Sequence, residues 1–218
     1  YAMYHLGSLA RQSRFKDDGV VRHDPGAALM WLTRAFDAGR LSAAFKVAVT
    51  HRELGDALEA MAWLQAYTYY MKGGDKPLPD SRLNWLRRGH IADLMAKLQD
   101  DLEGTDPEAI RARTIAVLER HGTRFEAAGR TPAPDTSDCR VKRPPKGFRA
   151  MVVHPVESSL VEIVAVVDPD GSARDVFILD STPDAMSANS MRQYGFRVFC
   201  TDGDGDRERL VSLTWNFV

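Results

Sequence analysis

The sequence predicts a two-domain protein in which an all-α helical-repeat domain precedes a small α+β domain. Residues 24–35 and 56–67 share one helical pattern at an offset of 32 residues. After residues 129–138, which are rich in Pro, Thr and Asp, apolar residues recur at every second position, as in a strand. We therefore predict a helical domain at 1–128, a linker at 129–138 and an α+β domain at 139–218.

Composition and charge are those of an ordinary globular protein. Of the 218 residues, 44% are hydrophobic and 27% are charged, and the formal net charge is −1. This balance excludes the strongly basic surface that nucleic-acid binding requires. The longest strand-like apolar run, Ile163–Val167, falls far short of the roughly 18–20 residues of a membrane span. Because the chain begins at Tyr1 rather than Met, we expect a signal peptide or a membrane anchor upstream of it.

The repeated pattern has the chemistry of a capped amphipathic helix. Asp24 and Asp56 stand at the N-cap of the two copies, and Pro25 occupies the first helical position of the first copy. The matched apolar positions share one helix face. They are Ala28, Trp31, Leu32 and Ala35 in the first copy and Ala60, Trp63 and Leu64 in the second. We expect both tryptophans to pack in the core, and lining a ligand groove is the alternative role.

Three stretches of the first copy, AMYHLG, GVVRHD and AALMWLTRAFDAG, follow the pattern of a known repeat family. The residues that match it are Ala2, Leu6, Gly7, Val21, Asp24, Ala28, Trp31, Ala35 and Gly39. They resemble a Sel-like repeat, a relative of the tetratricopeptide repeat. The resemblance covers residues 1–73, and the second copy, from about Ser42, departs from it by a shortened loop, RELG. It implies a solenoid of stacked helix pairs that offers an extended surface to a partner.

Two further amphipathic stretches follow the repeats. Apolar residues keep helical spacing from Leu83 to Leu102. Asp106 and Pro107 then open another helix, with a capping residue and a proline at the first position, and Gly122 interrupts it. We expect these helices to cover the exposed apolar end of the repeats.

The C-terminal domain begins with a predicted β-hairpin. From Val161 to Val167 the odd-numbered positions are apolar, the turn DPDG follows, and a second strand-like run continues through residues 176–179. A short helix is expected at about 184–194, and the chain closes on the strand RLVSLTWNFV. The predicted fold of this domain is a three-stranded antiparallel sheet with one main helix.

Several segments of this domain follow the pattern of a second family. The lead-in RPPKGFRA, the strand and turn VEIVAVVDPDG, the strand end VFILDS and the helix end RQYGF occur in that order. They resemble the C-terminal domain of TonB-type energy transducers over residues 139–218, with Tyr194 in place of the usual Trp and no Pro soon after Phe196. In that family the last strand pairs with an extended peptide of an outer-membrane transporter.

The TonB resemblance implies that residues 209–218 form a peptide-binding strand. Its candidate binding face consists of Leu210, Ser212, Thr214 and Asn216. The opposite, apolar face consists of Val211, Leu213, Trp215 and Phe217, and we expect it to pack on the helix. A partner would bind by β-augmentation, in which an added strand extends the sheet.

The two cysteines, Cys139 and Cys200, lack the C-x-x-C spacing or the nearby histidine pair of a zinc site. By themselves they are either two unrelated buried thiols or one disulfide. The TonB resemblance implies the disulfide, because many relatives carry cysteines at these two places. A disulfide in turn implies an oxidising compartment, for which we predict the periplasm of a Gram-negative bacterium.

No constellation of residues indicates catalysis. The six histidines lack metal-site spacing, and no G-x-S-x-G motif occurs. The acidic loop at 201–208 departs from a calcium loop, with Arg207 where the glycine is required. The basic segment 140–149 is interpreted as a solvated strand, with a phosphate or lipid-headgroup patch as the alternative. We therefore predict no catalytic residue, no metal and no cofactor.

These observations together predict a non-enzymatic adaptor of the cell envelope that binds a protein or peptide partner, possible partners being envelope or outer-membrane proteins. One alternative is a TonB-type energy transducer for an outer-membrane transporter, which requires an upstream membrane anchor. A less favoured alternative is a cell-wall-acting enzyme whose site is assembled from loops. A nucleic acid is not expected as a partner.

Overall fold

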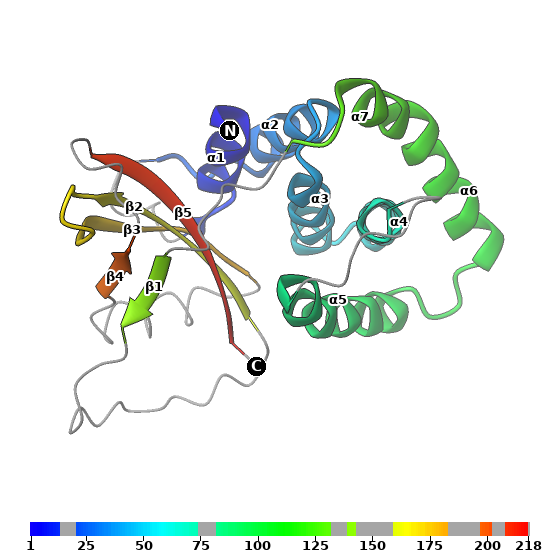
Figure 1. The fold of residues 1–218 in the computed structure, drawn as a ribbon. Helices are drawn as coiled ribbons and strands as arrows, with labels where there is room; N and C mark the ends of the chain where they lie inside the picture. The colour runs from blue at the N-terminus through cyan, green and yellow to red at the C-terminus, as the bar shows by residue number, and fades with distance from the viewer. Residues whose placement is uncertain are drawn as a thin grey trace. The chain divides into compact units, whose positions relative to one another are not determined.

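A computed structural model of the chain describes residues 1–13, 21–73, 82–131, 139–142, 159–182, 197–201 and 208–217. The chain divides into two units, Tyr1–Pro132 and Ala133–Val218 (Figure 1). In the described ranges all helices belong to the first unit and all strands to the second. The predicted combination of a helical part with a small antiparallel sheet is confirmed, and the division falls inside the segment predicted as the linker.

The helical unit begins with four helices, each of which packs against the next along the chain. They are α1 (Ala2–Ala10), α2 (Pro25–Asp37), α3 (Leu41–Glu53) and α4 (Ala57–Met71). The first pair is in close contact, because a Cβ on Gly7 of α1 would lie only 2.6 Å from the Leu32 Cγ of α2. A larger residue at this position would therefore push the two helices apart.

The helices start and end as their capping residues predict. The Asp24 carboxylate accepts a hydrogen bond from the Ala27 N–H at 2.9 Å, and the Asp56 carboxylate accepts one from the Glu59 N–H at 3.2 Å. These bonds satisfy backbone donors that have no partner inside the helix. Just beyond the end of α2, Gly39 adopts φ of 90°, a conformation that favours glycine.

Of the remaining helices, α5 (Arg82–Asp101) and α6 (Pro107–Val117) pack against α4, and α7 (Thr123–Ala128) packs against α2. A π-helical turn (Leu118–Gly122) joins α6 and α7 without a break. The interruption predicted at Gly122 is thus a widened turn within a continuing helix, and a Cβ there would overlap the Tyr70 hydroxyl. The run from α6 to α7 contacts both α4 and α2, so it covers a side of the helix row (Figure 1). Within the described ranges, no helix has both the length and the apolar composition that a membrane span needs.

An aromatic cluster holds α7 against α2 and α4. The Phe36 ring stacks on the Phe125 ring at a centroid distance of 4.8 Å, and its contact with the Trp63 ring, at 5.4 Å, is edge-on. Trp63 is only 4% exposed, so its predicted core role is confirmed. Trp31 is only half-buried, and the Arg34 guanidinium lies 5.3 Å from its ring centroid. The prediction that both tryptophans pack in the core is therefore confirmed for Trp63 and wrong for Trp31, because Phe36 fills the core from α2.

The second unit contains a three-stranded antiparallel sheet and a separate pair of short strands. The sheet has the order β3 (Ala173–Thr182), β2 (Ser159–Val167), β5 (Arg209–Phe217). The short strands β1 (Cys139–Lys142) and β4 (Arg197–Cys200) pair antiparallel with each other. The predicted hairpin and final strand are confirmed, and β1 overlaps the strand interpreted at 140–149, whereas the sequence analysis does not predict β4.

The core of this unit lies on one face of β2. Val161, Ile163, Ala165 and Val167 are at most 1% exposed, as their alternation predicts. Val211 of β5 packs into the same core beside the buried Cys200. The helix predicted at 184–194, against which the apolar face of the last strand is expected to pack, lies outside the described residues.

Candidate functional site

The last strand, β5, forms one edge of the sheet. It pairs with β2 over its whole length, from Arg209 opposite Val167 to Phe217 opposite Ser159, without a shift of register. In the described part of the chain no strand pairs with its other side. In an antiparallel strand alternate residues direct their N–H and C=O groups to opposite sides. Half of the backbone groups of β5 therefore point away from β2, toward the side with which no described strand pairs.

The candidate binding residues occupy the expected positions on this strand. Leu210 is 67% exposed and Ser212 is half-buried, whereas Val211 is buried and Leu213 packs against the core. The predicted alternation of faces is thus observed at residues 210–213. By their backbone register Thr214 lies opposite Glu162 and Asn216 opposite Leu160, and the side chains of these two candidates lie outside the described ones.

The other edge of the sheet, β3, is irregular. Its pairing with β2 shifts register between Glu162 and Ile163 and again between Val164 and Val166. Near the second shift Asp175 has a φ of 50°, the left-handed region that Asp tolerates better than most residues. Such bulges bend a strand and break its ladder of hydrogen bonds, which blocks the addition of a further strand.

A disulfide lies at the end of the sheet where β5 begins. Cys139 and Cys200 are directly opposite each other in the β1–β4 pair, and their sulfur atoms are 2.04 Å apart. The Cys200 N–H donates a hydrogen bond to the Gly171 carbonyl at 2.9 Å, and a Cβ on Gly171 would overlap the Cys200 carbonyl oxygen. The β1–β4 pair is therefore attached to the turn between β2 and β3.

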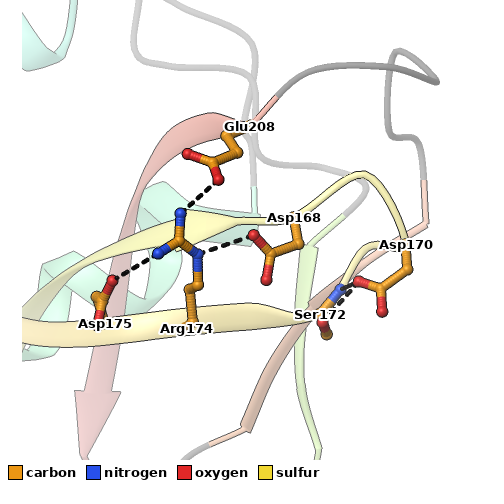
Figure 2. A network of polar contacts seen from close by, with 6 residues as sticks. All are labelled: Asp168, Asp170, Ser172, Arg174, Asp175 and Glu208. Carbon is orange, nitrogen blue, oxygen red and sulfur yellow. Dashed lines mark hydrogen bonds and ion pairs between the residues drawn. The ribbon is translucent and has the colours of Figure 1, made fainter.

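Arg174 joins this turn to the start of β5 (Figure 2). Its guanidinium donates hydrogen bonds to Asp168 at 2.9 Å, to Asp175 at 3.2 Å and to Glu208 at 2.5 Å. The hydrogen bond to Asp168, followed by the charges of Glu208 and Asp168, raises the pKa of Arg174. All four side chains are at least partly exposed, so the network orients the strand ends more than it stabilises the fold.

Asp170 closes the turn between β2 and β3 (Figure 2). Its carboxylate accepts hydrogen bonds from the Ser172 hydroxyl at 2.6 Å and from the Ser172 N–H at 2.8 Å. These bonds favour the ionised form and hold the pKa of Asp170 below its usual value. The turn that the sequence predicts from Pro169 and Gly171 is thus closed by a side chain as well.

A buried polar cluster in the helical unit bears on the enzyme alternative. Lys46, 1% exposed, donates to the Ser8 hydroxyl at 2.5 Å, and Ser8 donates to the Tyr4 carbonyl at 2.8 Å. A serine beside a lysine serves as nucleophile and base in some hydrolases. Here Ser8 is fully buried between α1 and α3, so a substrate cannot reach its hydroxyl in this conformation. The arrangement is that of a packing contact.

A second polar group lies on the π-helical turn. His121 contacts Asp37 through Nδ1 at 2.8 Å, and its ring centroid is 5.1 Å from that of Trp63. Arg124 also donates to Asp37, at 3.0 Å. These contacts join α7 to the end of α2 and include no nucleophile. Within the described ranges no three metal-ligating side chains come together.

The hydroxyl of Tyr70 is buried under the same turn. It donates a hydrogen bond to Glu126 at 2.8 Å. Burial, assisted by this bond to a carboxylate, raises the pKa of Tyr70 well above its ordinary value. Tyr70 therefore stays neutral at physiological pH and acts as a hydrogen-bond donor between α4 and α7.

Sequence reasoning did not identify the partners in these contacts. The pairs Ser8–Lys46, Asp37–His121 and Tyr70–Glu126 join residues 38 or more positions apart.

No protein-family model, no curated protein and no solved structure matches the chain. The resemblances to Sel-like repeats and to the TonB C-terminal domain therefore stay predictions.

Proposed function

We propose that the protein is a non-enzymatic adaptor that binds an extended segment of a partner protein along β5. The observation that carries this proposal is the contrast between a regular nine-residue edge, β5, and an irregular one, β3. Soluble proteins usually protect long regular edges, because unpaired backbone groups attract other strands. A partner strand that completes the ladder accounts for an edge with which no strand in the described ranges pairs.

The helical unit is proposed to be a short Sel-like solenoid that binds a second partner. The N-caps Asp24 and Asp56 are separated by the repeat offset, and each accepts from the N–H three residues further on. Helices α1 to α4 also pack in chain order, as stacked repeats do. These features support the repeat interpretation, although the aromatic contacts of α7 depart from simple stacking.

We place this adaptor in the periplasm. The Cys139–Cys200 bond supports an oxidising compartment, in which disulfides form and persist. Free-thiol titration of the protein extracted from whole cells, with thiol exchange blocked, checks this part. Two reactive thiols in the native, unreduced protein would remove its support.

The binding role of β5 is tested by selecting ligands from a library of random twelve-residue peptides against the full chain. We expect selected peptides to perturb the amide NMR signals of residues 209–217 and to leave those of β3 unchanged. The absence of any peptide that perturbs β5 would refute the proposed function.

Single proline substitutions at Ser212 and Leu213 supply a matched pair of controls. Because adjacent N–H groups point to opposite sides of a strand, one proline removes a bond to β2 and the other removes an outward donor. Because Leu213 packs against the core, Leu213→Ala and Ser212→Ala serve as references for the lost side chains. Relative to its reference, the variant that loses the outward donor should retain its melting temperature and lose the peptides. If both variants bind as the natural chain does, the peptides do not use the edge.

A further inference from the structure

Both halves of the disulfide contact the first residues of β5. The Arg209 guanidinium lies 4.0 Å from the Cys139 Sγ. Cys200 is 1% exposed and packs in one apolar cluster with Val211 of β5 and Val167 of β2. Cys139 packs against the same cluster from β1. The state of the disulfide therefore bears on the N-terminal end of β5.

The two cysteines are attached unequally to the rest of the sheet unit. β4 is attached to the β2–β3 turn, because the Cys200 N–H donates to the Gly171 carbonyl at 2.9 Å and Ser172 forms a β-bridge with Phe199. In the described ranges β1 pairs with β4 alone, over four residues. So short a ladder is marginally stable without further support. The disulfide is therefore the strongest link between β1 and β4.

We propose that the Cys139–Cys200 bond is a redox switch of the β5 edge, opened by a protein dithiol, and that the reduced form binds peptides more weakly. This inference rests on the proposed function, because the regulated property is strand binding by β5. In the oxidised form the bond keeps β1 against β4 and against the core beside Val211. In the reduced form β1 opens from β4, and the start of β5 loses packing on its core side.

The reaction is a thiol–disulfide exchange between the cystine and the dithiol. Cys139 is half-buried and Cys200 is buried, so the first thiolate of the dithiol bonds to the Cys139 Sγ while the sulfur–sulfur bond breaks. Cys200 leaves as a thiolate and takes a proton. The second thiolate of the dithiol then attacks the dithiol's own bonded sulfur, and Cys139 leaves as a thiolate. Two electrons pass to the cystine, and the dithiol becomes a disulfide.

Arg209 favours the reduced form. Its guanidinium is in position to stabilise the Cys139 thiolate, because a cationic side chain stabilises a neighbouring thiolate. A disulfide is reduced more readily when the thiolates that it releases are stabilised. Arg209 is also the first residue of β5. The residue that favours opening of the bond therefore belongs to the strand that the opening affects.

The first test measures peptide binding in the two redox states of the full chain. The probes are the peptides selected from the twelve-residue library against the oxidised chain, with and without dithiothreitol. Reduction should weaken their binding about twofold to tenfold, the size that the loss of one backbone hydrogen bond gives. The amide NMR signals of residues 209–211 should shift on reduction, while those of residues 173–182 remain those of folded β3. The Cys139→Ser, Cys200→Ser double variant is the control, and dithiothreitol should not change its binding.

The second test measures the equilibrium between the disulfide and dithiothreitol. Arg209→Gln removes the charge and should lower the equilibrium constant for reduction about twofold to fivefold, the size of one partly exposed charge interaction. Arg209→Lys is the matched control, because it keeps the charge, and its constant should stay near that of the natural chain. Equal constants in all three chains would overturn the part assigned to Arg209.

The outcomes separate the switch from the proposed function. Equal binding by the oxidised and the reduced chain would overturn the switch and leave edge binding intact, and so would tighter binding by the reduced chain. Loss of the folded β3 signals on reduction would also overturn the switch, because the bond would then hold the whole sheet unit together. If no selected peptide perturbs β5 in the oxidised chain, the proposed function fails together with the switch.

Discussion

The two edges of the same sheet differ in regularity and in charge. β3 has two register shifts against β2, a left-handed residue at Asp175 and an ion network around Arg174. β5 pairs with β2 without a shift, and Arg209 is the one ionisable residue in its sequence. Both strands hydrogen-bond to β2, so the central strand does not account for the difference.

This contrast shows where the sequence protects the protein against strand addition. Bulges and edge charges are the usual means of protection, and β3 has both. β5 has no bulge and, apart from Arg209 at its first position, no charge, so nothing in its own described residues opposes the addition of a strand. The four predictions that follow test this contrast, beginning with the largest expected change in stability.

Removal of the disulfide should have the largest effect, because it releases β4 from β1 at the end of the sheet that both edges share. The Cys139→Ser, Cys200→Ser double variant should lose about 4 kcal/mol, the loop-closure estimate for a bond that spans 61 residues. Denaturant unfolding of the sheet unit measures this loss. The helical unit contains no cysteine and should unfold as before. Equal losses in both units would show that the division into two units is wrong.

A β-branched residue at position 175 should destabilise the irregular edge strand β3. Asp175→Val places a β-branched side chain at φ of 50°, which should cost about 1–2 kcal/mol. Asp175→Asn is the matched control, because Asn tolerates the left-handed region and differs only in charge. Denaturant midpoints of the two variants check the prediction. If both variants are equally stable, the bulge does not depend on the backbone preference of this residue.

A lysine substitution should weaken peptide binding when it is made on β5 and leave binding unchanged when it is made on β3. Leu210→Lys on β5 should change the free energy of unfolding by no more than about 0.5 kcal/mol, because Leu210 is exposed. It should weaken binding of the selected peptides about twofold to fivefold through edge charge. Val176→Lys on β3 is the control, at a position that is 36% exposed against 67% for Leu210, and it should bind them normally. Equal losses in both variants would mean that the peptides do not distinguish the edges.

The smallest effect concerns the turn that precedes β3. The hydrogen bonds from the Ser172 hydroxyl and N–H hold the pKa of Asp170 below its ordinary value, so NMR titration should give a lowered pKa. Ser172→Ala removes the hydroxyl and should raise this pKa part of the way, because the N–H remains. A lowered native pKa stabilises the turn above the unfolded pKa, near 4, and this contribution disappears as the pH falls through the native value. If the pKa of Asp170 is unchanged in this variant, the Ser172 hydroxyl is not the cause of the lowered pKa.

The sequence predicted those features that depend on neighbouring residues. The caps Asp24 and Asp56 and the alternation along β2 are local signals, and the structure confirms each of them. The face of β5 at Leu210 and Val211 was predicted for the same reason. Trp31 was assigned to the core from its spacing alone, and spacing does not reveal that Phe36 fills that place.

Local sequence patterns do not predict the features that decide the candidate site. The short strands CRVK and RVFC have too few residues for a period to be counted, and they pair across 61 positions. The bulges of β3 depend on its register against β2, which no single strand contains. That β5 lies at an edge, and not at the centre, likewise follows from the order of all three strands.

The Cys139–Cys200 bond also determines how the second unit transmits a pulling force. Tension that enters at Cys139 passes through the sulfur–sulfur bond to Cys200 and then directly along the chain to β5. The residues between the two cysteines, which include β2 and β3, form a closed loop that a pull on the chain ends cannot extend. A partner that pulls on β5 therefore loads the hydrogen bonds between β5 and β2, while the β2–β3 hairpin lies outside the covalent path of the force.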